Sequence, residues 1–220
     1  MLGESFQKNE KYSTLFIYRY LYRFNINYFM VVDSSQVESA MERLVGNRSW
    51  EEMIDREPLL SFSFYLSGRI NVLLEIADEI IDHLDSSFSG AVVNGSEYDR
   101  ASSLMWLWSL AAYEVVRTIC AAPGCFSQAA NDRFKSLKDR LAKVRMPAAK
   151  MEKRGRRRPV SSNRSPDGLD PQNKDLLIGD PEVSPMISAR ALLKQFNEVF
   201  ASIFRDDVLK GHETEYEDAS

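Results

Sequence analysis

Cysteine and histidine are scarce in this 220-residue chain, which contains two of each. The thiols are Cys120 and Cys125, and the imidazoles are His83 and His212. A structural zinc site normally takes four Cys or His ligands at short spacings, and these four residues are too scattered to supply them. A chain of this size with two cysteines needs no disulfide framework, which is typical of a reducing compartment. The sequence therefore predicts a cytoplasmic protein without a zinc finger.

Long apolar runs are absent as well. The two most apolar stretches are residues 15–32 and 104–122, and charged residues interrupt both, in the second case Glu114 and Arg117. Because each charge at the centre of a bilayer costs about 2.5–3.5 kcal/mol on insertion scales, neither stretch is suited to span a membrane. Residues 1–4 also lack the basic leader of a secretory signal. We therefore expect no contact with a membrane.

Eight prolines and ten glycines are too few for the many turns of a β-sandwich, and they leave long stretches free for helices. Apolar residues at helical spacing predict a short helix over 50–57 and longer helices over 59–84, 96–122, 128 to about 147, and from 184 or 188 onward. Most of these segments have one apolar face, which is typical of helices that pack together. The sequence thus predicts a mainly α fold, a bundle of four to five helices.

Residues 14–32 follow a different pattern. Every second residue from Phe16 to Val32 is apolar or aromatic, which is typical of a strand, and the length favours a hairpin turning near Asn25. A helical stripe through Phe16, Tyr20 and Phe24 is an alternative interpretation of the same residues. We therefore expect a small N-terminal β element that covers the bundle or pairs with a second copy in a homodimer.

Composition divides the chain into three parts. Residues 1–13 are polar and are predicted to form a flexible N-terminus, and residues 211–220 an acidic flexible tail. Residues 14–210 are predicted to form a single helical domain. Within it, a proline-rich stretch at about 154–184 is predicted to be a long loop.

Positive charge is concentrated in one segment. Residues 133–158 contain twelve Lys or Arg and two acidic residues, a net charge of +10, so the remainder carries −14 of the total −4. Such asymmetry favours an acidic partner, either nucleic acid or protein, although a solvated helix face followed by a basic loop would have the same composition. Lys135, Lys138 and Arg145 stand away from the apolar stripe and are expected at the surface. The residues predicted to contact the partner are Arg140, Lys143, Arg145, Lys150, Lys153, Arg154, Arg156, Arg157 and Arg158.

A second charged group is acidic and contains Glu75, Asp78, Glu79 and Asp82. Glu75-Ile-Ala-Asp78 resembles half of the magnesium-binding signature of all-α nucleoside-triphosphate pyrophosphohydrolases. That resemblance implies a Mg²⁺ cofactor and a first ligand pair, for which Glu52 and Asp55 are the nearest substitutes although they depart from the family's two glutamates. At about 100° per residue, however, these acids lie opposite the apolar residues Ile70, Leu73, Ala77, Ile80 and Leu84. The pattern predicts that the acids face water, and we favour an interpretation without a metal or other cofactor.

A third group, Glu114 and Arg117 with Tyr113, lies in the most apolar helix. A charge in such a helix needs a partner, so the simplest interpretation is an ion pair at the edge of the core. A polar pocket between helices is the functional interpretation, and these three residues are our first choice for catalysis if the chain is an enzyme.

Other catalytic signatures are missing. The chain has no glycine-rich phosphate loop and no Gly-x-Ser-x-Gly motif. Ribonucleases of the HEPN type, which are helical bundles, use an arginine four to six residues before a histidine, whereas Arg205 stands seven residues before His212. A HEPN-like bundle without that activity remains an alternative, as does the magnesium enzyme. The leading hypothesis is a non-catalytic interaction module whose basic segment contacts an acidic partner.

Overall fold

A computed structural model describes residues 49–150, 167–180 and 185–212. They all belong to one unit of the chain, which begins at Ser49. The predicted N-terminal β element at 14–32 and the flexible N-terminus predicted at 1–13 lie outside the described residues.

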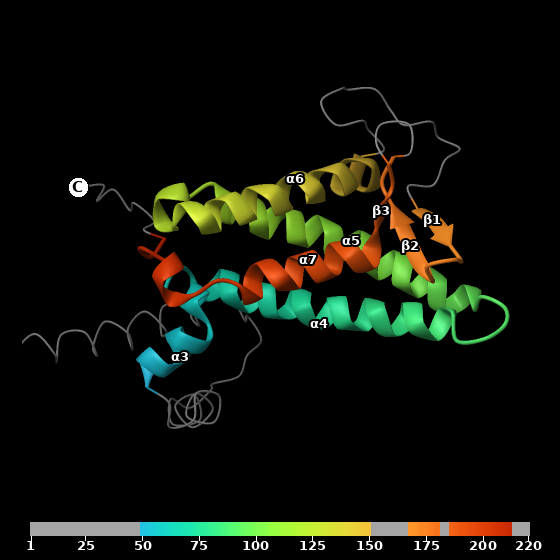
Figure 1. Cartoon of the computed structure of the whole chain (residues 1–220), viewed down its shortest axis with the longest axis horizontal. Coiled ribbons are helices and arrows are strands. Elements are labelled where there is room, and N and C mark those ends of the chain that lie inside the picture. Colours follow the sequence, from blue (N-terminus) through green and yellow to red (C-terminus); the bar gives the residue numbers. More distant parts are fainter. Residues whose placement is uncertain (1–48, 151–166, 181–184, 213–220) are drawn as a thin grey trace, which may run out of the picture. The chain divides into compact units, whose positions relative to one another are not determined.

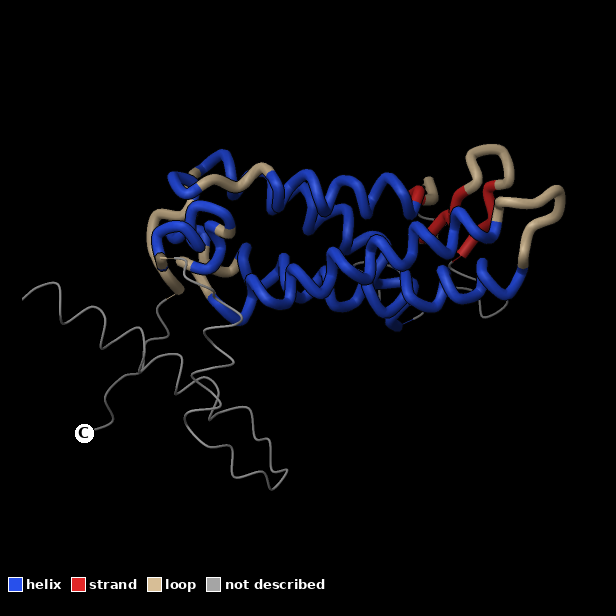
Figure 2. The backbone as a smooth tube through the Cα atoms, turned by 90° about the horizontal axis from the view of Figure 1, so that it is seen from below, coloured by secondary structure: helices blue, strands red, loops and turns tan. Residues whose placement is uncertain are grey.

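Four long helices form the body of this unit: α4 (Phe64–Ser87), α5 (Gly95–Cys120), α6 (Gln128–Lys150) and α7 (Ala189–Ala201). The short helix α3 (Trp50–Arg56) precedes them. Each long helix runs antiparallel to the one before it, and α7 returns against α6 and α4 (Figure 1 and Figure 2). This arrangement confirms the predicted helical bundle.

Side-chain caps and short turns decide where these helices begin. The helix predicted from residue 59 begins at Phe64, because Pro58–Leu60 form a 3-10 turn and the Ser63 side chain accepts a hydrogen bond from Leu66 N at 3.3 Å. At its C-terminal end, α6 extends beyond the predicted end at about residue 147: it continues through Pro147 to Lys150.

The small sheet has three antiparallel strands in the order β1-β2-β3. These are β1 (Asp167–Asp170), β2 (Asp175–Ile178) and β3 (Ile187–Ser188), and they lie beside the first turns of α5 and α7 (Figure 1). The β element of the described chain is therefore C-terminal rather than N-terminal. The first two strands also correct the predicted loop at 154–184. Four-residue strands are too short to show a clear period, and contacts with other elements hold them.

Hydrogen bonds attach the sheet to the bundle. Tyr98 Oη donates to the Gly168 carbonyl at 2.8 Å, and Ser102 Oγ donates to Asp167 Oδ2. Asp175 is buried and accepts hydrogen bonds from Leu176 N and from Ser188 Oγ. The sheet thus joins α5 to the start of α7.

Aromatic side chains run through the core between the helices. Trp108 is 1% exposed, donates from Nε1 to the Leu73 carbonyl at 2.9 Å, and packs against Phe196 with ring centroids 5.0 Å apart. Phe200 continues the cluster toward Phe134, at a centroid distance of 5.8 Å. This packing connects α4, α5, α6 and α7 in a single core.

The segment after α7 crosses the far end of the bundle. Val208 forms a β-bridge with Phe126, and Leu209 N donates to the Cys125 carbonyl at 2.9 Å. His212 N donates to the Phe62 carbonyl at 2.8 Å, and the two rings stack at 5.3 Å. Residues 211 and 212, predicted to belong to a flexible tail, therefore contact the folded unit. Within the described ranges, no helix has the length and apolar character needed to cross a bilayer.

Candidate site for an acidic partner

Charged side chains from α5 and α6 meet on the seam between these helices. Arg117 Nε donates to Glu114 Oε2 at 2.7 Å, within α5. Arg145 of α6 reaches Glu114 Oε1 with Nη2 at 3.1 Å, and its guanidinium lies 4.8 Å from the centroid of the Tyr113 ring. The structure thus brings the three residues first chosen for catalysis next to a residue predicted to bind the acidic partner. We call Tyr113, Glu114, Arg117 and Arg145 the seam cluster.

Solvent reaches the seam cluster unevenly. The side chains of Arg117 and Glu114 are 57% and 44% exposed, whereas that of Arg145 is 24% exposed. Two guanidinium groups therefore flank the one Glu114 carboxylate. Arg145 was expected to be available at the surface, but it is engaged by Glu114 and Tyr113, because the neighbouring helix supplies partners that sequence spacing does not show.

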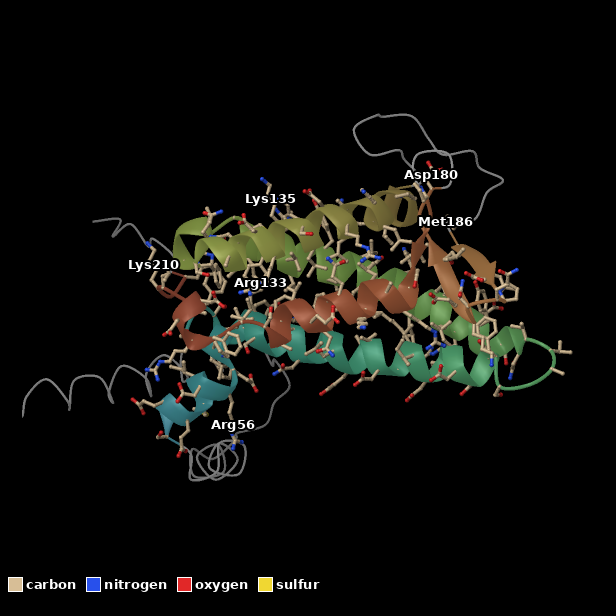
Figure 3. All side chains as sticks on the ribbon, in the orientation of Figure 1. Arg56, Arg133, Lys135, Asp180, Met186 and Lys210 are labelled. Atoms are coloured by element: carbon tan, nitrogen blue, oxygen red, sulfur yellow. The ribbon has the colours of Figure 1, made fainter. Side chains whose placement is uncertain are left out.

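Other basic residues of α6 divide into engaged and exposed groups. Arg133 pairs with Asp207 at 2.9 Å, and Arg140 donates to Gln195 Oε1 of α7 at 2.7 Å. Lys135 and Lys143 are exposed, and Figure 3 shows Lys135 pointing away from the bundle while Arg133 points toward α7. Of these four basic residues of α6, Lys135 and Lys143 are therefore the exposed ones.

Lys138 also lies on the seam, close to Cys120 of α5. Burial raises the pKa of the Cys120 thiol, and the positive charge of Lys138 opposes that shift. A thiol with a raised pKa is a poor nucleophile at neutral pH, so Cys120 gives no indication of catalysis here.

The remaining residues predicted to contact the acidic partner follow Arg145 in the sequence. Lys150 is the last residue of α6, and its side chain is not among those described. Lys153, Arg154, Arg156, Arg157 and Arg158 lie outside the described residues.

The acidic residues of α4 point to solvent, as their spacing predicts. Glu75, Asp78, Glu79 and Asp82 are exposed, whereas the apolar residues on the opposite side of the helix are buried. Asp55 is also exposed and pairs with Arg205 at 3.0 Å. Among the described residues, no three His, Cys, Asp or Glu side chains form a group able to hold a metal ion. The carboxylates suggested by the magnesium signature, including Glu52, thus form no such group.

A network of polar contacts around His83 links α4 and α5, and no sequence motif predicted it. His83 Nδ1 lies 2.6 Å from Glu97 Oε2, and His83 Nε2 lies 3.7 Å from Glu79 Oε1. Arg100 approaches the same Glu79 oxygen at 3.6 Å. These residues come from two helices and meet only after folding. Their contacts join the helices at the surface.

A hollow of about 180 Å³ lies between the sheet and the α5–α6 seam. Burial raises the pKa of Asp167 at its wall, against a hydrogen bond from Ser102 that lowers it. The hollow is smaller than the roughly 300–1,000 Å³ of usual ligand pockets. It was missed because residues 154–184 were expected to be a loop. Its lining residues are Met105, Trp106, Ser109, Val144, Asp167, Ile178 and Gly179.

The described residues define the class as a mainly α helical bundle with a small C-terminal sheet. In comparisons with known proteins, no family model, no curated protein and no solved structure matches the chain.

Proposed function

We propose that this chain is a non-catalytic interaction protein that binds an acidic partner through its basic segment, residues 133–158, and the adjoining α5–α6 seam. The observation that carries the proposal is the charge asymmetry of +10 in this segment against −14 elsewhere. A surface of one sign attracts a partner of the other and raises its association rate.

The described side chains add a second line of support. Arg117 of α5 brings a cation from outside the basic segment to the seam where Arg145 lies. Lys135 and Lys143 are exposed on α6. Both helices of the α5–α6 hairpin therefore offer solvent-accessible cations to an acidic partner.

The test is binding of the full chain to a fluorescently labelled oligonucleotide, followed by anisotropy while the salt concentration is raised. We expect affinity to fall steeply, since each phosphate contact contributes a slope of about −0.7 to −0.9 in log K against log salt. Replacing Lys135 and Lys143 by Glu should weaken binding. Replacing Arg156, Arg157 and Arg158 by Gln should weaken it further.

The matched control replaces Lys194 and Lys210 by Glu. These lysines are also exposed, lie outside the basic segment, and give the same change in total charge. Equal loss in both double variants would mean that total charge alone drives binding. Absence of binding, or binding that ignores salt, would refute the proposal.

A further inference from the structure

The Glu114 carboxylate lies between two guanidinium groups: Oε2 accepts a hydrogen bond from Arg117, and Oε1 forms an ion pair with Arg145. The distances are 2.7 Å from Arg117 Nε to Oε2 and 3.1 Å from Arg145 Nη2 to Oε1. Arginine pairs bind the oxygens of phosphate groups in the same way, because guanidinium geometry suits both anions. We propose that Arg117 and Arg145 form a phosphate-binding site that the chain's own Glu114 occupies. This inference rests on the proposed function and names the ligand of the same seam.

Glu114 is held in a manner that allows exchange. Its side chain is 44% exposed and that of Arg117 is 57% exposed, and ion pairs with so much access to water contribute little to stability. Arg145 is 24% exposed and lies over Tyr113, with its guanidinium 4.8 Å from the ring centroid. Tyr113 thus gives Arg145 a contact that does not involve Glu114.

The ligand must compete with a carboxylate that is tethered beside the site. A carboxylate from another protein brings the same single charge without the advantage of the tether. A phosphate monoester carries about −1.5 to −2 charges and three acceptor oxygens, so it gains from the exchange. The site therefore selects phosphate groups, and the terminal monoester of a nucleic-acid strand should bind it better than an internal diester.

The experiment compares Glu114→Gln with the wild-type chain, using labelled single strands that carry a 5′-phosphate or a 5′-hydroxyl. Removing the competing charge should strengthen binding of the phosphorylated strand by about two- to five-fold at low salt, the range expected for one exposed charge. The gain should be smaller for the hydroxyl strand. Arg117→Gln should remove the preference for the 5′-phosphate.

Glu75→Gln is the matched control, because it removes one exposed carboxylate from α4 with the same change in total charge. A similar gain in this control would overturn the inference, and so would unchanged or weaker binding by Glu114→Gln. The last result would mean that Glu114 positions the arginines or plays no part.

The outcomes separate this inference from the proposed function. If the wild-type chain binds with salt dependence but Glu114→Gln brings no gain, only the phosphate site fails. If Glu114→Gln alone binds, the two arginines bind phosphate once Glu114 is removed, but the wild-type chain does not use the site and the proposed function fails. If neither binds, both fail.

An acidic peptide that binds Glu114→Gln more tightly than the phosphorylated strand would overturn the assignment to phosphate. If Glu114→Gln does not fold, the Arg117→Gln comparison decides.

Discussion

Tyr98 lies in an environment that disfavours its ionised form. Burial raises its pKa to about 12, and the nearby carboxylates of Asp167, Asp175 and Asp99 act in the same direction. The phenol also donates a hydrogen bond to the Gly168 carbonyl at 2.8 Å, a bond that needs the proton. Protonated Tyr98 therefore holds β1 against α5.

This environment predicts a loss of stability in alkali. The ordinary pKa of 10.0 applies to the unfolded chain and the raised value of about 12 to the folded one. The contribution of Tyr98 is therefore fully present below pH 10.0 and is lost as pH rises through about 12. The tyrosinate absorbance of the wild-type chain minus that of Tyr98→Phe should titrate near pH 12 when folded and near 10.0 in urea. Titration near 10.0 in both conditions would contradict the prediction.

At the scale of elements, α7 depends on the sheet for its start. Ser188, the last residue of β3, accepts a hydrogen bond from Ala191 N at 3.0 Å and donates its own hydroxyl to Asp175. Asp175 Oδ1 also accepts from Arg190 N at 3.3 Å. One serine thus ends a strand, caps a helix and contacts the neighbouring strand.

Ser188→Ala should therefore destabilise the chain. Loss of an N-cap costs about 0.5–2 kcal/mol, and the Asp175 carboxylate also loses its hydroxyl partner. We expect a loss of about 1–2 kcal/mol in the free energy of unfolding, measured with urea, with faster hydrogen exchange in the first turn of α7. The control is Ser103→Ala, at an exposed position inside α5, which should change stability by less than about 0.5 kcal/mol. Equal effects at the two positions would rule out a special role for Ser188.

At the scale of the whole molecule, the two charged regions lie on different helices. Glu75, Asp78 and Asp82 are exposed along α4, whereas Lys135 and Lys143 are exposed on α6. Among the residues that the structure describes, these carboxylates are exposed and no group of three or more of them could hold a metal ion.

Addition of Mg²⁺ or Mn²⁺ should accordingly leave the melting temperature unchanged. An ion that bound the folded chain would stabilise it by about 2.7 kcal/mol at one hundred times its Kd, which a thermal-shift assay detects. Incubation of the chain with a panel of nucleotides should also release no pyrophosphate. A saturable rise in melting temperature that Asp78→Asn abolishes would revive the magnesium-enzyme alternative.

The fold class and the direction of the acidic residues could be predicted because both follow from local periodicity. Ile70, Leu73 and Ala77 recur at helical spacing, so the opposite face of α4, with Glu75 and Asp78, had to face water. Helix ends were less predictable. Ser63 and Asn94 cap α4 and α5, whereas other polar residues nearby were equally plausible from the sequence.

The sheet and the seam cluster could be predicted only in part. Glu114, Arg117 and Tyr113 were selected because a charged pair in an apolar helix needs a partner, but nothing in the spacing identifies Arg145, which follows Glu114 by 31 positions. The strands β1 and β2 were missed because four-residue strands carry little periodicity. Tyr98 and Ser102, two of the residues that hold β1, lie far away in the sequence.

The sequence by itself determined that the chain forms amphipathic helices and concentrates its positive charge in residues 133–158, because periodicity and composition are local properties. The tertiary structure decided which cations are engaged, where the sheet lies and how Glu114 meets two arginines. Those features depend on contacts between residues distant in the chain, and only the packing of helices against one another brings such residues within hydrogen-bonding distance.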